Sequence, residues 1–437
     1  MIGRSGTCSL PPLMVILAPV AGGVGVAVLG MLIEGSSGRG SETEKGRKCY
    51  HSRRVLHGTL RNVKRSPATR KLAPTPALKS RPAADGFYMP AEFAPHERCW
   101  MLWPERPDIW RQRALPAQQA FALLAAAIAR FEPVTVGASA RQLAFARAAL
   151  LPHIRVVPLG SDDAWMRDVG PTFVVNGAGQ RRGVDWRFNA WGGIYAHCRR
   201  DDAVAAQVLA AEHSARYRAP MINEGGAIHT DGEGTLLVTE QCLLNPNRNP
   251  QLSVAAIESL LCDYLGAQRV IWLGAGVIND ETSGHIDNLA CFARPGEVCL
   301  TWSDNRRDPQ YRVSRDAFER LAAARDARGR RLRVHKLPSP GPLYMTAAEA
   351  AGIARGAGTR QVSAGHRLAG SYVNFYLANG AVIAPLLDPR TDAAALRILR
   401  RVFPQRQVVA VPAREILLGG GNIHCVTQQV PRVGRRR

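Results

Sequence analysis

The chain has 437 residues, of which 46% are hydrophobic and 21% are charged, so it can form one large globular domain or two ordinary ones. Its net charge of +22 is uneven: residues 1–88 contain 14 Lys and Arg against 4 Asp and Glu, and residues 432–437 contain four Arg. Because most of the excess lies at the two ends, the charge favours solvated basic tails over a nucleic-acid-binding surface.

The nine cysteines are an odd number, and none of them forms a C-x-x-C pair. This usage argues against a disulfide framework and a zinc ribbon, and it is typical of a protein in the reducing cytosol. The histidines show neither H-x-x-x-H nor H-E-x-x-H spacing, so the sequence predicts no metal site.

The first part of the chain differs from the rest. Residues 9–33 are uncharged and long enough to span a bilayer or to form the core of a signal peptide, although glycines and prolines weaken a helix there. Residues 34–86 are basic and rich in Ser, Gly, Arg and Pro, which predicts disorder. We therefore expect residues 1–85 to be a leader that is disordered or absent from the mature protein, with a start near Met89 as another interpretation. A leader at 1–35 leaves export or membrane anchoring open.

Order is expected from residue 86 onward. An apolar strand at 99–104 ends at Pro104. Helices rich in Ala, Leu and Arg are predicted at 116–130, 141–150, 203–213, 253–265, 311–327 and 392–402. Strands follow several of them, at 134–136, 155–157, 269–272, 332–334 and 408–410. Turn signals between the helices predict hairpins that begin at 172–175 and that join 227–229 to 236–238, 288–292 to 298–301 and 372–377 to 381–383.

The sequence of hairpin, helix and strand recurs about every 55–75 residues, with little residue identity between the copies. A period of this length favours a propeller-like or solenoid array over a plain αβ sandwich. No linker rich in Pro, Gly and Ser interrupts residues 87–431, so we expect one domain over 86–431, followed by a basic tail at 432–437.

Four clusters of polar residues fall beside these hairpins, at 162–171, 223–226, 280–288 and 419–429. In the last, three glycines lead to Cys425, a position where a thiolate can attack a bound group; a buried structural cysteine is the alternative interpretation. His285 and Asp287 are two positions apart, which on a strand places both side chains on one face. The alternative for this pair is an ordinary surface contact.

Carboxylates recur in three of the four clusters, so a site built from them is anionic. Such a site suits a flat cation with several donors, and guanidinium has that shape and charge. A cysteine nucleophile with a histidine acid and base would then attack the guanidinium carbon.

Seven motifs resemble those of the agmatine deiminase family and occur in the order of that family. They are MPAE at 89–92, WMRD at 165–168, DWRFNAWGG at 185–193, EGG at 224–226, NPNRNP at 245–250, GHIDN at 284–288 and GGGNIHCVTQQVP at 419–431. The resemblance implies a fivefold pseudosymmetric α/β propeller of ββαβ units. It also implies hydrolysis of agmatine to N-carbamoylputrescine and ammonia, without a cofactor, in putrescine and polyamine biosynthesis.

The same resemblance implies roles for single residues. Cys425 is the expected nucleophile that forms an amidino-cysteine intermediate, and His285 is the expected proton donor and acceptor. Asp168 and Asp287 are expected to bind the guanidinium nitrogens. The resemblance further implies that Trp165 packs on the substrate, that Glu281 contacts its distal part, and that Glu224 is structural. Ile194 stands where lysine is expected in most relatives, and the neighbouring segment 198–200 also departs from the family pattern.

Two other functions compete with agmatine hydrolysis. One is a deiminase of peptidyl or free arginine, which an arginine or lysine near the distal pocket would favour because free arginine has an α-carboxylate. The other is a non-catalytic binding protein on the same scaffold. The expected partner is a small cationic guanidine and not a nucleic acid, a membrane contact requires that the leader is retained, and the sequence leaves a homo-oligomer open.

Overall fold

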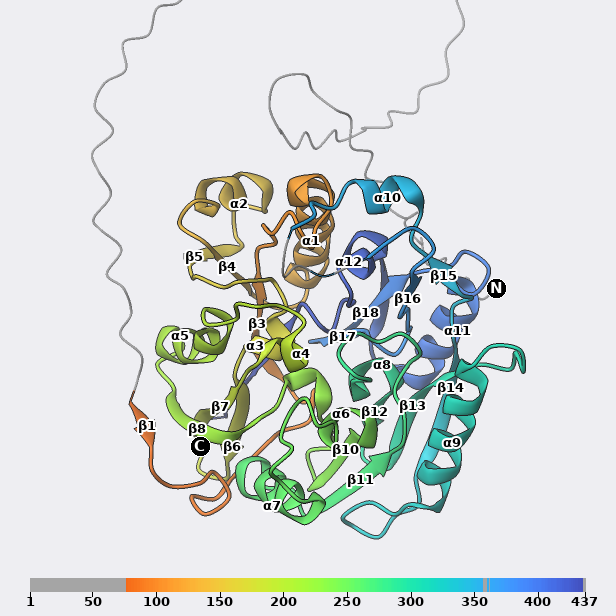
Figure 1. The fold of residues 1–437 in the computed structure, drawn as a ribbon. Coiled ribbons are helices and arrows are strands. Elements are labelled where there is room, and N and C mark those ends of the chain that lie inside the picture. The colour runs from red at the N-terminus through yellow and green to blue at the C-terminus, as the bar shows by residue number, and fades with distance from the viewer. Residues whose placement is uncertain (1–75, 357–359, 361, 435–437) are drawn as a thin grey trace, which may run out of the picture. The chain divides into compact units, whose positions relative to one another are not determined.

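Mixed sheets and helices alternate along the computed structural model, which describes residues 76–356, 360 and 362–434 (Figure 1). All of these residues belong to one unit, 72–437. The apolar stretch at 9–33 and most of the basic segment after it lie outside the described residues. Within the described ranges, no helix combines the length and the apolar character that a bilayer span requires. The fold belongs to the mixed α/β class.

One arrangement of strands recurs in five of the sheets that the described residues form. Two antiparallel strands are combined with a helix and with a third strand that pairs in parallel with the second. Four copies are continuous: β6 (Thr172–Asn176), β7 (Arg181–Arg187), α5 (Val204–Ala211), β8 (Ala215–Ile222); β9 (His229–Thr230), β10 (Thr235–Thr239), α7 (Val254–Leu265), β11 (Arg269–Leu273); β12 (Ala290–Arg294), β13 (Glu297–Trp302), α9 (Gln310–Ala323), β14 (Arg333–Pro338); and β17 (Tyr376–Ala378), β18 (Ala381–Leu386), α11 (Asp392–Val402), β19 (Gln407–Pro412).

The fifth copy joins distant parts of the chain. Strand β20 (Gln428–Pro431) pairs antiparallel with β3 (His96–Leu102), with Gln428 opposite Trp100. Helix α1 (Leu115–Ala129) then leads to β4 (Val134–Ala138), which pairs in parallel with β3. The last strand of the described chain therefore completes the sheet that one of its first strands begins.

The remaining elements extend these sheets or connect them. Strand β1 pairs with β8, β2 with β6 and β5 with β4, while β15 and β16 pair with each other. These elements are β1 (Ala77–Leu78), β2 (Phe87–Tyr88), η1 (Gln112–Ala114), α2 (Leu143–Ala149), β5 (Arg155–Pro158), α3 (Met166–Val169), α4 (Ala190–Gly193), η2 (Asp201–Ala203), η3 (Gly225–Ala227), α6 (Glu240–Leu243), α8 (Ile286–Leu289), β15 (Leu343–Tyr344), α10 (Ala347–Ala351), β16 (Arg367–Leu368) and α12 (Arg414–Leu418).

The predicted helices and parallel strands are confirmed to within a few residues. The helix predicted at 253–265 is α7, which begins where the Ser253 side chain accepts a hydrogen bond from the Ala256 amide and ends at Gly266, whose φ is +65°. The turn predicted at Asn379 and Gly380 joins β17 to β18, and Gly380 has a φ of +76°. Local capping and turn chemistry therefore explain why these boundaries could be predicted from the sequence.

Other predicted boundaries are wrong. The hairpin strands expected from 227, 288 and 372 begin later, at 229, 290 and 376. His285 and Asp287 do not share one face of a strand, because the chain turns at Ser283 and Gly284, where φ is +67° and +83°, and enters the single helical turn α8. Part of the predicted leader, residues 76–85, belongs to the fold, since β1 pairs with the edge of β8.

These later strand starts leave room for short segments that carry polar residues. Segment 223–227 precedes β9, α8 precedes β12, loop 371–375 precedes β17 and loop 419–427 precedes β20, while α3 lies just before β6. Each segment thus occupies the same place in its copy of the recurring unit. In Figure 1, α3, α4 and α8 lie near the middle of the arrangement, where the sheets meet.

Candidate active site

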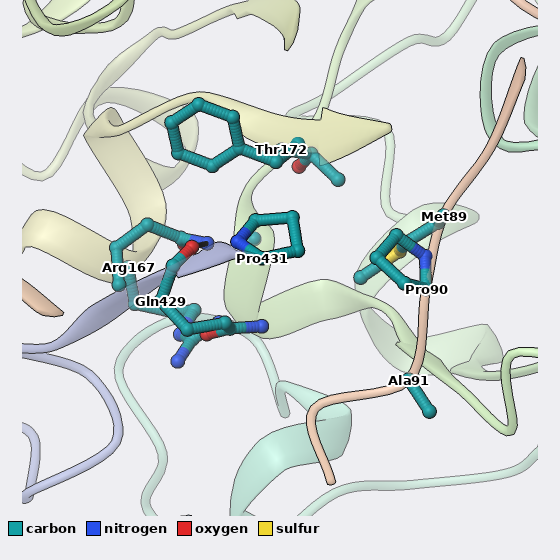
Figure 2. Close-up of a pocket in the computed structure, with 10 residues that line it drawn as sticks. Met89, Pro90, Ala91, Arg167, Thr172, Gln429 and Pro431 are labelled. Carbon is teal, nitrogen blue, oxygen red and sulfur yellow. Dashed lines mark hydrogen bonds between the residues drawn. The ribbon is translucent and has the colours of Figure 1, made fainter. Parts of the chain in front are cut away.

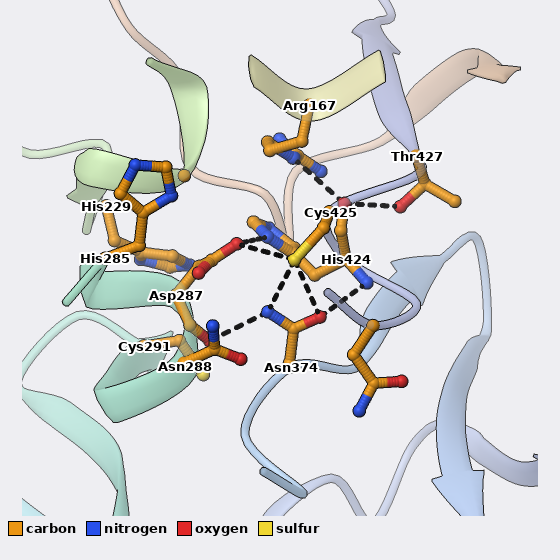
Figure 3. A network of polar contacts seen from close by, with 12 residues as sticks. Arg167, His229, His285, Asp287, Asn288, Cys291, Asn374, His424, Cys425 and Thr427 are labelled. Carbon is orange, nitrogen blue, oxygen red and sulfur yellow. Dashed lines mark hydrogen bonds and ion pairs between the residues drawn. The ribbon is translucent and has the colours of Figure 1, made fainter. Parts of the chain in front are cut away.

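Cys425 lies in the loop before β20, with its thiol buried against polar side chains (Figure 3). Its Sγ accepts a hydrogen bond from Asn374 Nδ2 at 3.3 Å and lies 3.6 Å from Asp287 Oδ2. Burial raises the pKa of the Cys425 thiol well above its usual value, and the carboxylates of Asp287 and Asp168 raise it further. Without a bound cation, the sulfur is therefore a protonated thiol that donates to a carboxylate.

The glycines before Cys425 allow a close approach of the backbone. A Cβ on Gly421 would lie 2.5 Å from Trp165 Cζ3 and 3.1 Å from Cys425 Sγ, and Gly420 has a φ of +114°. Only glycine fits both requirements without displacing its neighbours. The glycine run thus sets the sulfur beside the Trp165 ring.

His285 precedes α8 and is almost fully buried. Its Nδ1 lies 3.8 Å from Asp168 Oδ1, and its Nε2 lies 3.6 Å from Glu224 Oε2. Burial alone would lower the pKa of His285, but the Asp168 carboxylate, together with the Cys242 and Glu224 side chains, raises it well above its usual value. The imidazole is therefore protonated at neutral pH and faces the site through Nδ1.

The two aspartates have different surroundings. Asp168 accepts hydrogen bonds from Trp191 Nε1 at 2.9 Å and from the Gly226 amide at 3.0 Å, and burial raises its pKa to about 6. Asp287 accepts a hydrogen bond from His424 Nδ1 at 2.9 Å. Burial alone would raise the pKa of Asp287, but the hydrogen bond and charge of His424 hold it below its usual value. Both carboxylates are ionised at neutral pH.

Gly226 marks the point where these groups converge. A Cβ built on Gly226 would lie 2.6 Å from His285 Nδ1, 2.8 Å from Asp168 Oδ1 and 3.0 Å from Asp287 Oδ2. Asp287 Oδ2 in turn lies 3.6 Å from Cys425 Sγ. The structure therefore brings together four residues that the sequence analysis selects from distant parts of the chain.

This crowding predicts that Gly226→Ala lowers kcat/KM for a guanidine substrate by about 10²-fold or more, because a shift of about 1 Å in catalytic groups has that effect. Steady-state kinetics would measure the loss. Gly160→Ala is the matched control, since no atom lies within 4 Å of a Cβ at Gly160 and its φ is not positive. Wild-type activity in Gly226→Ala would contradict the placement of His285 and the aspartates.

A buried chain of charges supports Asp287 from behind, and Figure 3 shows its first contact, between His424 and Asp287. His424 Nε2 lies 2.9 Å from both carboxylate oxygens of Glu92, and Arg167 Nη1 donates to Glu92 at 3.1 Å. The Arg167 and His424 charges outweigh burial and lower the pKa of Glu92 well below its usual value. Glu92 and His424 stand 332 positions apart, and the sequence analysis gives them no role although both lie in the recognised motifs. Asn374 lies outside those motifs, so no sequence signal indicated its contact with Cys425.

Aromatic and acidic side chains line the pocket in front of Cys425. The lining residues include Trp165, Asp168, Trp191, Ile194, Tyr195, Glu281, Thr282, Asn288 and the glycines 419–421. Trp165 is fixed by a hydrogen bond from its Nε1 to Asp163 at 2.7 Å and by the Trp110 ring, whose centroid is 5.2 Å away. The pocket therefore offers flat apolar walls and negative charge.

Glu281 lines this pocket but already has cationic partners. Both of its carboxylate oxygens accept hydrogen bonds from Arg360, and His366 Nε2 lies 3.2 Å away. Burial would raise the pKa of Glu281, but His366 and Arg360 lower it overall. The third Arg360 nitrogen donates to the Leu418 carbonyl, so each of the three guanidinium nitrogens already makes a hydrogen bond.

Glu224 contributes a second buried carboxylate behind His285. Its Oε1 accepts a hydrogen bond from Arg248 Nε at 2.8 Å, and neither side chain is exposed. Arg248 also donates to the carbonyls of Trp191 and Thr282 at 2.8 Å. This arginine therefore ties the Trp191 wall of the pocket to the loop that carries His285.

Arg167 lines a separate hollow (Figure 2). Its lining includes Met89, Pro90, Gln429 and Pro431, and it shares no residue with the pocket in front of Cys425. It holds none of the predicted catalytic side chains. The pocket at Cys425 is therefore the candidate active site.

Comparisons with known proteins agree with this geometry. The chain is 58% identical over 360 residues to the agmatine deiminase of Stutzerimonas stutzeri, covering 98% of that protein and 81% of this chain. It is 58% identical over 358 residues to that of Pseudomonas aeruginosa, covering 97% of that protein and 80% of this chain. A solved structure of the Enterococcus faecalis agmatine deiminase matches with a TM-score of 0.80 at 44% identity, covering 82% of this chain and 99% of that chain. The sequence profile of one family matches residues 88–431, and the chain therefore belongs to the Porphyromonas-type peptidyl-arginine deiminase family.

Proposed function

We propose that this protein hydrolyses agmatine to N-carbamoylputrescine and ammonia. The observation that carries the proposal is the convergence of a thiol, an imidazolium and two carboxylates beside a pocket with aromatic walls, which Asp168 and Cys425 line. Two relatives at 58% identity are agmatine deiminases, and the match covers nearly their full length. This supports the same substrate here. The proposal includes a role in putrescine and polyamine biosynthesis in the cytoplasm, which the agmatine deiminase relatives and the cysteine usage support.

The proposal extends to the architecture. A fivefold pseudosymmetric α/β propeller of ββαβ units over residues 86–431, followed by a tail at 432–437, is supported by the five recurring units. The pairing of β20 with β3 supports closure of the ring. In Figure 1 the five sheets follow one another around a common centre. Each unit then delivers one short polar segment to the site.

Substrate binding comes first in the proposed mechanism. Asp168 and Asp287 accept hydrogen bonds from the guanidinium nitrogens, and the Trp165 ring packs against the substrate. Both carboxylates hold the Cys425 thiol protonated until their charge is shared with a cation. The guanidinium supplies that cation, so substrate binding itself favours the thiolate that attacks it.

The covalent step follows from the protonation states. Cys425 Sγ bonds to the guanidinium carbon, and His285 transfers a proton to one NH₂ group, which leaves as ammonia. The amidino-cysteine intermediate keeps the agmatine chain. The neutral His285 then takes a proton from water and the hydroxyl adds to the same carbon. The carbon–sulfur bond breaks while the hydroxyl proton passes to the departing sulfur, which releases N-carbamoylputrescine and restores the Cys425 thiol.

Hydrolysis of arginine is the competing reaction, and a basic residue near the distal pocket would favour it. Arg360 is the candidate for that role because it pairs with Glu281, which lines the pocket. Its Nε and Nη2 atoms donate to Glu281, and its Nη1 atom donates to the Leu418 carbonyl. A substrate carboxylate would therefore meet Glu281 rather than a free guanidinium, which favours agmatine over arginine.

The direct test is an assay of the purified protein with agmatine, in which ammonia and N-carbamoylputrescine are quantified against a Cys425→Ser control. Equal product in the two samples would reject the proposal. Comparison of kcat/KM for agmatine and for free arginine measures the discrimination between the substrates. A higher value for arginine would overturn the assignment of agmatine, and turnover of neither guanidine would favour the non-catalytic binding protein.

Acid should inactivate the enzyme through Asp168. Its pKa is raised to about 6, so below that pH the carboxyl group is protonated and no longer pairs with the guanidinium. We expect kcat/KM for agmatine to fall by about tenfold per pH unit below about pH 6, because agmatine keeps its guanidinium charge throughout this range. A pH series of kcat/KM would measure this limb. A flat profile down to pH 4.5 would contradict it.

A further inference from the structure

Three potential metal ligands meet behind His285, on the side away from Cys425. They are Glu224, Cys242 and His285, which come from the segment before η3, from α6 and from the residue before α8. One ligand atom of each lies within 4.8 Å of the others. Glu224 and Cys242 are fully buried and His285 is 1% exposed. The cluster therefore combines a carboxylate, a thiol and an imidazole in a space that bulk water does not reach.

Two of these ligand atoms form a buried ion pair. Glu224 Oε2 and His285 Nε2 lie 3.6 Å apart, which is longer than a hydrogen bond, and neither atom forms a hydrogen bond to another described residue. The opposite ends of both side chains are occupied, because Arg248 donates to Glu224 Oε1 and Asp168 faces His285 Nδ1. The Nε2 proton of His285 therefore lies between two potential ligands of a cation, within 4.8 Å of the Cys242 sulfur.

We propose that Glu224, Cys242 and His285 form a binding site for a thiophilic divalent cation such as Zn²⁺, and that the bound ion inhibits the enzyme. The binding depends only on these three residues, whereas the inhibition rests on the proposed function. Cysteine sulfur, histidine nitrogen and carboxylate oxygen are the ordinary ligands of Zn²⁺, with water as the fourth. Because Zn–S and Zn–N distances are about 2.3 Å and 2.0–2.1 Å, the ligand atoms need to move together by about 1 Å. A thiolate in the set selects against Mg²⁺ and Ca²⁺.

Charge balance favours the replacement of two protons by one Zn²⁺ ion. One Zn²⁺ replaces the proton of the Cys242 thiol and the Nε2 proton of His285, so the total charge of the buried cluster does not change. Arg248 keeps its hydrogen bond to Glu224 Oε1 while Oε2 turns to the ion. The ion therefore does not require a new charge to be buried.

The position of the ion explains the inhibition. With Zn²⁺ on Nε2, the imidazole keeps one proton, on Nδ1, which faces Asp168, a residue that lines the substrate pocket. Loss of that proton would leave an imidazolate, so His285 no longer alternates between imidazolium and neutral imidazole. Proton transfer to ammonia and from water then stops although Cys425 is untouched.

The binding test uses Co²⁺, whose bond to a thiolate gives a charge-transfer absorption, and the Cys425→Ser variant, in which the nucleophile cannot be the ligand. We expect one Co²⁺ per chain with this absorption in Cys425→Ser. The absorption should persist after further change of Cys299→Ser, a thiol that is equally buried on β13, and disappear after further change of Cys242→Ser. No absorption in Cys425→Ser, or persistence after Cys242→Ser, would overturn the proposal.

A second measurement does not depend on whether the Cys242 variant folds. X-ray absorption of Zn²⁺ bound to Cys425→Ser should show a single sulfur ligand at about 2.3 Å with nitrogen and oxygen ligands. A shell without sulfur, or with several sulfurs, would reject this site. In the active enzyme, Zn²⁺ should inhibit and EDTA should restore activity. Cys242→Ala should raise the Zn²⁺ concentration that gives half inhibition by about tenfold or more. An unchanged half-inhibitory concentration would place the inhibitory ion elsewhere. A wild-type protein without activity would reject the proposed function, but the Co²⁺ result would still test the binding site.

Discussion

Cys425→Ser is expected to lower kcat for agmatine by about 10⁴-fold or more, the scale seen when an enzyme loses its nucleophile. A serine hydroxyl ionises far less readily than a thiol, and here two carboxylates oppose ionisation. The Asp287 carboxylate stands 3.6 Å from Cys425 Sγ, and a bound guanidinium compensates for its charge only in part. Steady-state kinetics with agmatine would measure the loss, and intact-protein mass spectrometry of acid-quenched wild-type protein should detect the amidino adduct.

The control for this substitution is Cys299→Ser, which changes a fully buried thiol on β13. It should keep kcat within a few-fold of the wild type, and the adduct should remain on the peptide that contains Cys425. If Cys425→Ser retained more than a tenth of the wild-type kcat while folded, the covalent mechanism would be wrong. An adduct on another cysteine would identify that cysteine as the nucleophile instead of Cys425.

Asp168→Asn is expected to lower kcat/KM for agmatine by about 10³-fold, because a broken buried ion pair costs about 3–5 kcal/mol and each 1.36 kcal/mol is tenfold. The substitution keeps the shape of the side chain and removes one of the two charges that bind the guanidinium. The hydrogen bond from the Gly226 amide to Oδ1 can persist, so the loss should reflect charge rather than misfolding. Kinetics at saturating and limiting agmatine would separate kcat from KM.

This variant also tests the origin of the acid limb. The fall in kcat/KM below about pH 6 should disappear in Asp168→Asn, because the group whose pKa is raised to about 6 is gone. Asp326→Asn is a matched control, since Asp326 is buried but serves Arg330 in a surface turn. Its pH profile should match the wild type. An unchanged acid limb in Asp168→Asn would assign that limb to another group.

The main site residues could be predicted because each belongs to a motif that resembles one of the agmatine deiminase family. Cys425 follows three glycines, and His285, Asp287 and Asp168 stand beside turn signals. The recurring order of hairpin, helix and strand could be predicted because helix caps and Asn-Gly turns depend on only a few neighbouring residues. Local patterns therefore predicted the elements, whereas the roles of the four residues came from the family resemblance, because local chemistry alone left a structural cysteine and a surface contact as alternatives.

The supporting contacts could not be predicted because they depend on positions far apart in the chain. The pair Glu92 and His424 forms only when β20 completes the sheet of β3, and Asn374 reaches Cys425 from a loop that reads as a strand. The helical turn α8 follows from positive φ at Ser283 and Gly284, and Ser283 carries no sequence signal for that conformation. Tertiary packing decided these features, so single-sequence reasoning missed them.

The pairing of β20 with β3 has a consequence for synthesis of the protein. The nucleophile and the strand that anchors it are synthesised after the two aspartates and the histidine, because they follow them in the chain. A nascent or prematurely terminated chain can hold the guanidinium-binding carboxylates but carries no sulfur to attack with. A truncation before Cys425 therefore leaves at most a guanidinium-binding protein, whereas a chain that extends through β20 carries the complete set of site residues.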